Sequence, residues 1–195
     1  MSHFGLLDWY VLRIFPEDLS GRVILDVACG LGSWGFLIRV DKSGRPYIIG
    51  IDVWRPYLEK TNSFKIYDEI VQAQLPNIAL REKSVDFSLA CDVIEHLSIS
   101  VGYELLRRLE QITIRTIIVS TPLNWPQDEL RNNPYEKHVS EWTPATFAKL
   151  GYKTTLIDSL SKTLRLVDTV ESFALRRRPT PKFVLAYKNL ESEQK

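Results

Sequence analysis

The chain has 195 residues, enough to bury the core of one domain. Hydrophobic residues make up 45% of it and charged residues 25%, as in an ordinary globular protein. The net charge of +1 gives no overall positive field that would attract nucleic acid or an anionic membrane, which leaves only a local basic patch for such a role. No stretch approaches the ~18 apolar residues of a membrane span, and the N-terminus lacks the pattern of a signal peptide. We therefore expect a cytoplasmic protein.

The first part of the chain alternates helix and strand patterns. Apolar residues at helical spacing predict an amphipathic helix over 6–15, within an N-terminal helical segment of residues 1–20. Short β-branched runs predict buried strands over 22–28 and 47–52. Between them a glycine-containing turn leads into a helix over 34–40. This order is typical of a strand–helix–strand unit.

The same alternation continues through the middle of the chain. A polar helix is predicted over 56–64, a weaker strand over 69–73 and a third buried strand over 85–91. Apolar residues on one face then predict a helix over 101–112, with Ser100 as its N-cap.

The last part of the chain supplies the remaining elements. A strand over 115–120 runs into a proline-rich loop, and a short helix over 143–151 begins at a Thr-Pro pair and ends at a glycine. Strands over 153–157 and 182–187 flank a helix over 159–175. The whole pattern predicts an open, mostly parallel α/β sheet with helices on both faces.

Nothing in the sequence divides the chain into parts. There is no repeat or interdomain linker, so we expect residues 1–195 to form a single domain, with a frayed polar tail at 190–195. Cys29 and Cys91 lie in apolar stretches without zinc-ligand spacing. We interpret them as free buried thiols rather than a disulfide, and we predict no metal site.

A glycine-rich loop, Gly30–Gly35, follows the first predicted strand with the spacing GxGxxG. Glycines there allow a tight turn and a close approach of a ligand to the backbone, although a turn without a ligand is the alternative. Asp26 lies inside the strand, four residues before Gly30. A carboxylate at this place would repel a pyrophosphate but suits a ligand with a sulfonium and an ammonium group. The loop therefore favours S-adenosylmethionine over a dinucleotide.

A second acidic residue, Asp52, ends the strand over 47–52, about 20 residues after the loop. At that strand end a carboxylate can accept hydrogen bonds from both ribose hydroxyls of an adenosine. Capping of the next helix is the alternative. Because Asp52 fits either cofactor, the choice between them depends on Asp26.

Three segments carry a family resemblance: VILDVACGLGSWG at 23–35, IIGIDVW at 48–54 and VDFSLACDVIEHL at 85–97. They resemble the motifs of the class I S-adenosylmethionine-dependent methyltransferases, closest to the small-molecule (type 11) group that contains ubiquinone- and menaquinone-pathway enzymes. The resemblance covers roughly residues 7–151. It implies a Rossmann-like sheet of seven strands in the order 3-2-1-4-5-7-6, with the last strand antiparallel.

The resemblance also implies which residues contact the cofactor. Gly30 and Gly32 would line its methionine end, and Asp26 would shape their loop. Asp52 would hold the ribose, and Asp92 would face the methionine or the transferring methyl group. The full predicted set is Asp26, Ala28, Gly30, Gly32, Asp52, Val53, Gln74 and Asp92.

Gln74 is a departure from the family pattern. In this group an acidic residue usually follows the third strand and accepts a hydrogen bond from the adenine amine, whereas here that place holds a glutamine. A glutamine carbonyl can still accept this hydrogen bond.

Two of the three histidines are candidate catalytic bases, which methyl transfer needs only when the nucleophile carries a proton. His96 follows the fourth strand, at the edge where open α/β sheets bind ligands. His138 lies in the loop after the fifth strand, where many relatives place a histidine over the substrate mouth. A loop-shaping role for His96 and a solvated position for His138 are the alternatives, and His3 is given no role.

Other side chains are weighed as substrate contacts. Trp125 and Trp142 are candidate walls of a substrate pocket, with packing as the alternative. The run Arg176–Arg178 is either a solvated face or a contact for an anionic substrate. The triplet Asn133-Pro134-Tyr135 lies some 40 residues beyond the place of the motif of amino-methylating nucleic-acid enzymes, so we interpret it as a coincidence.

Our hypothesis is S-adenosylmethionine-dependent methyl transfer, by in-line displacement, to a small or medium acceptor. One alternative is a catalytically silent subunit with the methyltransferase fold that binds or activates a partner. Another is a nicotinamide-dependent oxidoreductase. The sequence carries no strong signal for a nucleic-acid partner and predicts no membrane span.

Overall fold

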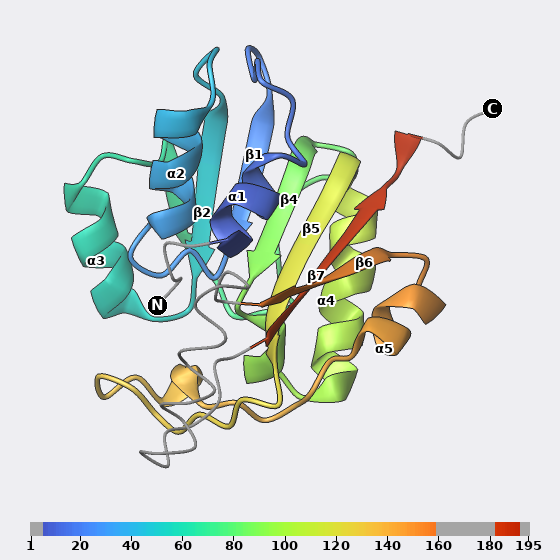
Figure 1. Cartoon of the computed structure of the whole chain (residues 1–195). Helices are drawn as coiled ribbons and strands as arrows, with labels where there is room; N and C mark the ends of the chain where they lie inside the picture. The colour runs from blue at the N-terminus through green and yellow to red at the C-terminus, as the bar shows by residue number, and fades with distance from the viewer. Residues whose placement is uncertain (1–5, 159–181, 192–195) are drawn as a thin grey trace, which may run out of the picture.

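A seven-stranded sheet forms the centre of the described part of the chain (Figure 1). The computed structural model describes residues 6–158 and 182–191. The strands lie in the order β3-β2-β1-β4-β5-β7-β6, which confirms the order that the family resemblance implied. Their bounds are β1 (Val23–Val27), β2 (Tyr47–Asp52), β3 (Glu69–Gln72), β4 (Val85–Cys91), β5 (Thr113–Leu123), β6 (Lys153–Asp158) and β7 (Lys182–Asn189).

β7 is the strand that breaks the parallel pattern. The first five strands pair in parallel, whereas β7 runs antiparallel to both β5 and β6. Its pairing with β5 continues from Thr116 to Leu123. Because this ladder satisfies the backbone of β5 along its whole second half, β5 ends later than the residue 120 predicted from the sequence.

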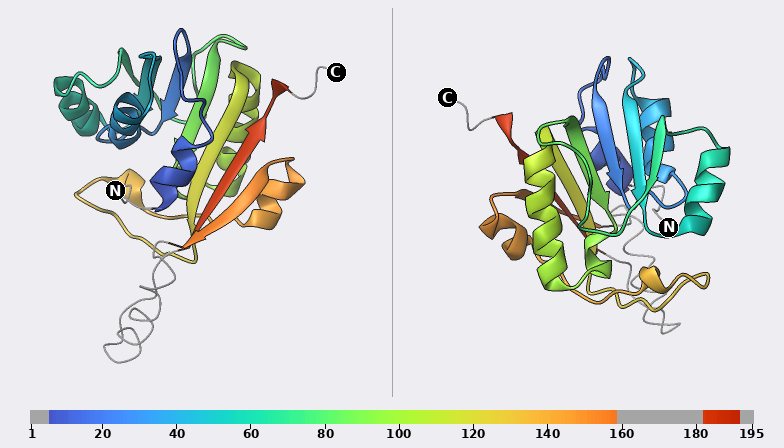
Figure 2. Two further views of the ribbon diagram at one scale, coloured as in Figure 1. Left: turned by 45° about the horizontal axis from the view of Figure 1, so that its top comes forward. Right: turned by 180° about the vertical axis from the view of Figure 1, so that it is seen from behind.

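Helices cover both faces of the sheet (Figure 2). The helices on one face are α1 (Leu6–Leu12), α2 (Ser33–Asp41) and α3 (Arg55–Ser63), and those on the other are α4 (Ile99–Ile112) and α5 (Pro144–Lys149). Successive strand side chains point to opposite faces, so Ile24 packs in the core under α1 and α2, and Leu25 packs under α4. The described helices include none with the length and apolar character needed to cross a membrane.

The N-cap of α4 differs from the prediction. The helix begins at Ile99, and the Ser98 hydroxyl accepts a hydrogen bond from the Val101 N–H at 3.4 Å. Ser98 is therefore the cap, and Ser100, predicted for that role, lies inside the first turn. The periodicity of apolar side chains marks the buried face of a helix but does not mark where its first turn begins.

The C-terminal segment is held more tightly than expected. The Leu190 N–H donates to the Arg115 carbonyl at 2.7 Å, and the Arg115 guanidinium pairs with Glu191 at 2.7 Å. The first two residues of the predicted frayed tail are thus attached to β5. Other predictions lie outside the described residues: His3, the helix over 159–175, the run Arg176–Arg178 and the end of the tail.

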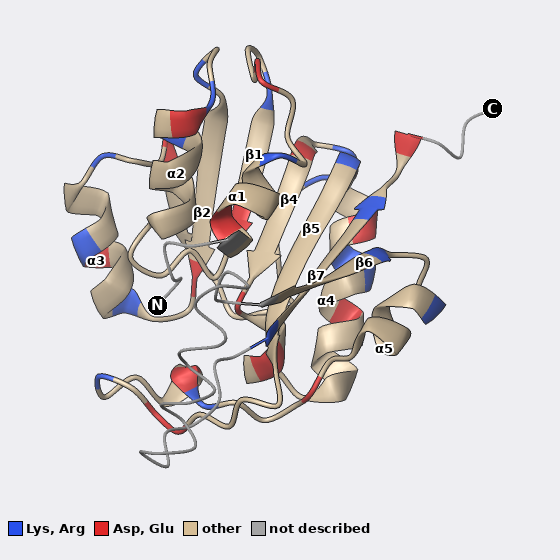
Figure 3. Cartoon of the chain, viewed as in Figure 1, with Lys and Arg blue, Asp and Glu red and all other residues tan. Residues whose placement is uncertain are grey.

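Charges of both signs lie side by side on the described elements (Figure 3). Arg39 of α2 pairs with Asp68 at 2.5 Å, and Lys188 of β7 pairs with Glu110 of α4 at 3.1 Å. This mixture agrees with the small net charge of the chain.

Trp142 is a core residue between α4 and α5. It is fully buried, and its ring centroid lies 5.1 Å from that of Tyr103 and 5.6 Å from that of Phe147. Its indole N–H donates to the Ser140 hydroxyl at 2.9 Å. The prediction that Trp142 walls a substrate pocket is therefore wrong. Gly102 of α4 leaves the room that this ring fills, because a β-carbon there would overlap it.

We expect Gly102→Ala to destabilise the protein, although alanine is the better helix former. Overpacking a filled core costs ~1–3 kcal/mol, while the helix gains at most ~1 kcal/mol. Urea denaturation should show a net loss of about 1–2 kcal/mol in the free energy of unfolding. Arg107→Ala, on the exposed face of the same helix, should change it by less than ~0.5 kcal/mol. An unchanged midpoint for Gly102→Ala would show that the ring can move aside.

Candidate cofactor and substrate site

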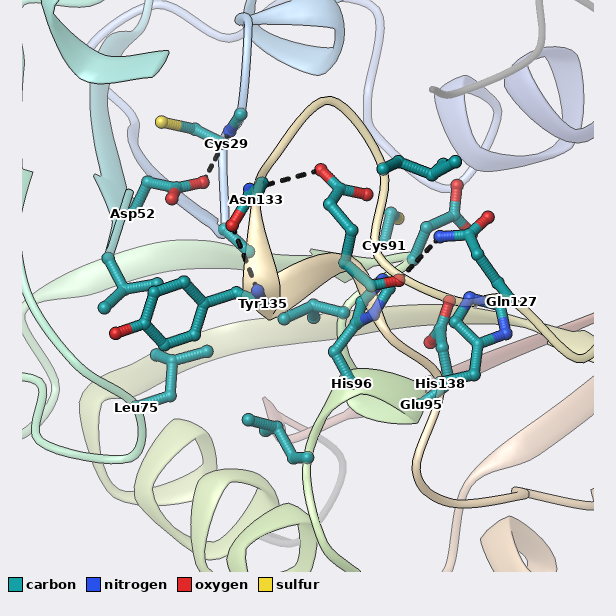
Figure 4. A pocket seen from close by; sticks show the side chains of 18 of the residues that line it. Cys29, Asp52, Leu75, Cys91, Glu95, His96, Gln127, Asn133, Tyr135 and His138 are labelled. Carbon is teal, nitrogen blue, oxygen red and sulfur yellow. Dashed lines mark hydrogen bonds between the residues drawn. The ribbon is translucent and has the colours of Figure 1, made fainter. Parts of the chain in front are cut away.

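A cavity of about 440 Å³ lies at the carboxyl ends of β1, β2 and β4 (Figure 4). In open α/β sheets ligands bind at this edge, where the order of the strands reverses. The loop between β5 and α5 forms the opposite wall. The predicted cofactor contacts that line the cavity are Ala28, Gly30, Asp52, Val53, Gln74 and Asp92. The predicted catalytic and substrate residues that line it are His96, His138 and Trp125.

Asp52 joins the ends of the first two strands. One carboxylate oxygen accepts the Gly30 N–H at 2.9 Å, and the other accepts the Trp54 N–H at 2.7 Å. Burial raises the pKa of Asp52 above its usual value, these backbone N–H groups oppose the rise, and the Glu136 carboxylate adds to it. The carboxylate thereby fixes the glycine loop beside the end of β2.

The two predicted loop glycines have different roles. A β-carbon at Gly30 would meet no atom nearer than the Ala28 carbonyl, at 4.0 Å, so the backbone faces open space in the cavity. At Gly32, where φ is +87°, a β-carbon would lie 3.2 Å from the Thr61, Ile66 and Tyr67 side chains. Gly32 therefore allows the turn into α2 and its contact with the protein core. It does not line the cavity as predicted.

Asp26 lies behind the glycine loop and does not line the cavity. The Tyr67 hydroxyl donates to its carboxyl at 2.5 Å, and the Gly35 N–H also donates to it. Burial raises the pKa of Asp26 to about 7, partly opposed by the Tyr67 hydrogen bond. The expectation that its charge faces a cationic ligand is thus corrected: the carboxyl lies behind the loop and accepts hydrogen bonds from Tyr67 and Gly35.

The chain turns sharply after β4. Asp92 has a φ of +54°, a conformation that Asp adopts more readily than most residues, and its carboxylate accepts the Ser120 hydroxyl at 2.9 Å. A short 3₁₀ turn, η1 (Ile94–His96), follows and places Glu95 in the cavity wall. Burial and then the Asp92 charge raise the pKa of Glu95 well above its usual value, while the Thr121 hydroxyl lowers it. From the sequence, Glu95 was recognised only as part of the motif at 85–97 and was given no role of its own.

The two predicted catalytic histidines lie together, with ring centroids 4.8 Å apart. The Nδ1 atom of His96 is 3.1 Å from the Lys137 carbonyl oxygen, and that of His138 is 2.6 Å from the Trp125 carbonyl oxygen. Burial lowers the pKa of His96. The sequence predicted each histidine separately, and the fold brings them to one place.

A further wall of the cavity connects α3 to the loop after β5. The Tyr57 hydroxyl donates to the Glu136 carboxylate at 3.1 Å, and the Gln127 amide donates to the Glu136 carbonyl at 2.7 Å. No sequence signal predicts a contact between residues 79 positions apart. Asn133 accepts the Tyr135 N–H at 3.0 Å and caps the 3₁₀ turn η2 (Pro134–Glu136), so the Asn-Pro-Tyr triplet forms a local turn.

We expect Asp26→Asn to change how stability depends on pH. The folded protein keeps the Asp26 proton up to about pH 7, whereas the unfolded chain loses it near pH 3.8. The contribution of Asp26 to stability therefore falls as pH rises through this window. Between pH 5 and pH 8 the wild type should lose about 2–3 kcal/mol of unfolding free energy relative to the variant. Urea denaturation of wild type and Asp26→Asn at pH 5 and pH 8 measures this loss of unfolding free energy. Parallel dependence on pH in the two proteins would contradict the prediction. Asp41→Asn at the surface is the control and should follow the wild type.

Comparisons with known proteins give the site a family context. The model of the methyltransferase-domain family matches residues 25–115. A search of curated proteins gave no match. An S-adenosylmethionine-dependent methyltransferase from Archaeoglobus fulgidus is 21% identical, with a TM-score of 0.62 over 94% of this chain and 93% of that one. One from Mesorhizobium loti is 17% identical, with a TM-score of 0.63 over 94% and 99%.

A third similar structure is the magnesium protoporphyrin IX methyltransferase of Synechocystis, solved with S-adenosylmethionine bound. It is 12% identical, with a TM-score of 0.58 over 93% of this chain and 76% of that one. The structural matches establish the architecture, and the family match covers the glycine loop, Asp52 and the turn after β4. Residues 25–115 therefore match the methyltransferase-domain family, and the chain has the fold of the class I S-adenosylmethionine-dependent methyltransferases.

Proposed function

We propose that this chain is a single-domain enzyme that transfers the methyl group of S-adenosylmethionine to a small or medium-sized acceptor. The observation that carries the proposal is the division of the cavity (Figure 4). Asp52 and Leu75 lie on one side, and Glu95, His96 and His138 lie on the other. The side with Asp52 can hold the cofactor, and the side with the two histidines can hold the acceptor group that receives the methyl.

The first side has the features that an adenosyl cofactor needs. The space at Gly30 allows close approach to the backbone. Each Asp52 oxygen accepts one backbone N–H and, having two lone pairs, can accept a ribose hydroxyl as well. Trp34, whose indole N–H is buried and has no hydrogen-bond partner among the described residues, also lines the cavity.

The chain's own contributions to the reaction are alignment and proton removal. When bound, S-adenosylmethionine supplies a methyl group on a positively charged sulfur. A lone pair of the acceptor forms the bond to the methyl carbon as the carbon–sulfur bond breaks, and that electron pair stays on sulfur. The cavity walls would hold acceptor and methyl in line and exclude water. His96 or His138 would take the proton of an acceptor that carries one.

Calorimetry with S-adenosylmethionine tests the assignment directly. We expect saturable binding of S-adenosylmethionine and of its demethylated product, and no binding of NADH. Heat from NADH alone would favour an oxidoreductase, and no heat from any of the three would favour a silent subunit. Incubation with methyl-labelled cofactor and fractionated small molecules should then give a labelled product together with the demethylated cofactor.

Asp52→Ala should weaken binding of the demethylated cofactor, because it removes the acceptor for the ribose and loosens the Gly30 loop. Loss of a buried polar partner costs ~1–3 kcal/mol, which corresponds to about 5- to 150-fold in Kd. Asp41→Ala, at the far end of α2, should leave the Kd unchanged. Equal affinity for wild type and Asp52→Ala would remove Asp52 from the site.

A further inference from the structure

Three side chains capable of binding a metal converge on the second side of the cavity. Glu95 and His96 come from η1, and His138 comes from the loop between β5 and α5. One ligand atom from each lies within 4.8 Å of the other two. The sequence predicted no metal site, because His138 is separated from the other two by the whole of α4 and β5.

The hydrogen bonds of the two histidines fix the atoms that they offer. A carbonyl oxygen only accepts hydrogen bonds, so Nδ1 of each ring must carry the proton that it donates to the Lys137 or Trp125 carbonyl. Each neutral imidazole then has its lone pair on Nε2. Histidines that bind metals commonly donate their other ring N–H to a backbone carbonyl, which fixes both the tautomer and the orientation of the ring.

The third group is a buried carboxylate oxygen without a hydrogen bond. Glu95 is 2% exposed, and its Oε2 atom has no partner of normal hydrogen-bond geometry; the oxygen of the nearby Thr121 hydroxyl also lacks one. Burying such an oxygen is costly unless a donor or a cation compensates it. The Glu95 carboxylate thus lies beside the two imidazoles, and one of its oxygens has no partner of normal hydrogen-bond geometry among the described residues.

We propose that Glu95, His96 and His138 bind a divalent transition-metal ion. Two imidazoles and one carboxylate are the ligands that Zn²⁺, Fe²⁺, Co²⁺ and Mn²⁺ accept, whereas Mg²⁺ and Ca²⁺ prefer oxygen ligands. An ion about 2.1 Å from each ligand atom would hold the atoms roughly 3–3.5 Å apart, so small side-chain rotations would complete the site. Both histidines are partly exposed to the cavity, which gives the ion a path of entry.

The ion would also define the acceptor, an inference that rests on the proposed function. Three protein ligands leave at least one coordination position open toward the cavity. A hydroxyl or phenol oxygen of the acceptor would occupy that position, and the ion would lower its pKa so that its proton is lost to solvent water before methyl transfer. With the ion bound, His96 and His138 act as its ligands rather than as bases. We therefore assign the acceptor to the class of hydroxyl compounds.

A cobalt titration tests the metal site without cofactor or acceptor. The full chain, treated with a chelator and free of any histidine tag, is titrated with Co²⁺ while visible d–d absorption is recorded. We expect saturation at one Co²⁺ per chain. Cys29 and Cys91 line the same cavity but are buried and lie outside the proposed ligand set, so no thiolate-to-cobalt charge-transfer band should appear. Absence of saturable binding, or a thiolate band, would overturn the proposal.

Two variants and two matched controls locate the site. His138→Asn and Glu95→Gln should each weaken Co²⁺ binding at least tenfold. His138 is partly exposed, so this variant stays informative if Glu95→Gln does not fold; thermal denaturation identifies folded proteins. Glu141→Gln, in the same loop but exposed, and His3→Asn should bind Co²⁺ like the wild type. Unchanged binding by folded His138→Asn, or equal loss in a control, would contradict the assignment.

The acceptor class has a separate readout. With methyl-labelled cofactor, wild type with metal should label hydroxyl compounds, and the chelated protein should have a raised KM for the acceptor with an unchanged Kd for the cofactor. Equal acceptor KM with and without metal would overturn the role of the ion while leaving methyl transfer intact. Failure of methyl transfer alongside normal Co²⁺ binding would overturn the proposed function and the acceptor class, but not the metal site.

Discussion

The carboxylate of Asp52 is the interaction on which the site depends. By accepting the N–H groups of Gly30 and Trp54 it connects the ends of β1 and β2, which parallel pairing has already placed side by side. Parallel strands bring all their carboxyl ends to one edge, so every loop that follows a strand adds to the same cavity. Without this link the glycine loop would be a flexible connection rather than a fixed wall facing open space.

A second anchor positions the opposite wall. The Glu95 carbonyl accepts the N–H groups of Val139 at 2.8 Å and Ser140 at 3.1 Å, and these bonds attach the long loop after β5 to η1. Trp142, buried between α4 and α5, holds the far end of the same loop in the core. The two histidines meet because the loop is fixed at both places.

Burial decides what the acidic groups of the site can do. Asp26, Asp52 and Glu95 are all shielded from water, and burial raises the pKa of each. The three differ in their partners. Asp26 is satisfied by Tyr67 and serves the loop, Asp52 is satisfied by the backbone and still has free lone pairs, and one Glu95 oxygen lacks a hydrogen bond. The three carboxyl groups have the same charge when ionised, so their roles are distinguished by the hydrogen-bond partners that each side chain reaches.

The sequence by itself determined the alternation of strands and helices, the glycine loop and the position of Asp52, because these follow from local periodicity and from motifs of adjacent residues. The strand order was implied by the family resemblance of those motifs. The pairing of His96 with His138, the contact of Tyr57 with Glu136 and the burial of Trp142 were decided by the tertiary structure, since each joins segments far apart in the chain. The same holds for Asp26: its place before the loop was visible, but whether it faced the ligand or the core depended on Tyr67, 41 positions away. Hydrogen bonds between distant segments leave no periodic trace in a single sequence, so only the folded chain shows them.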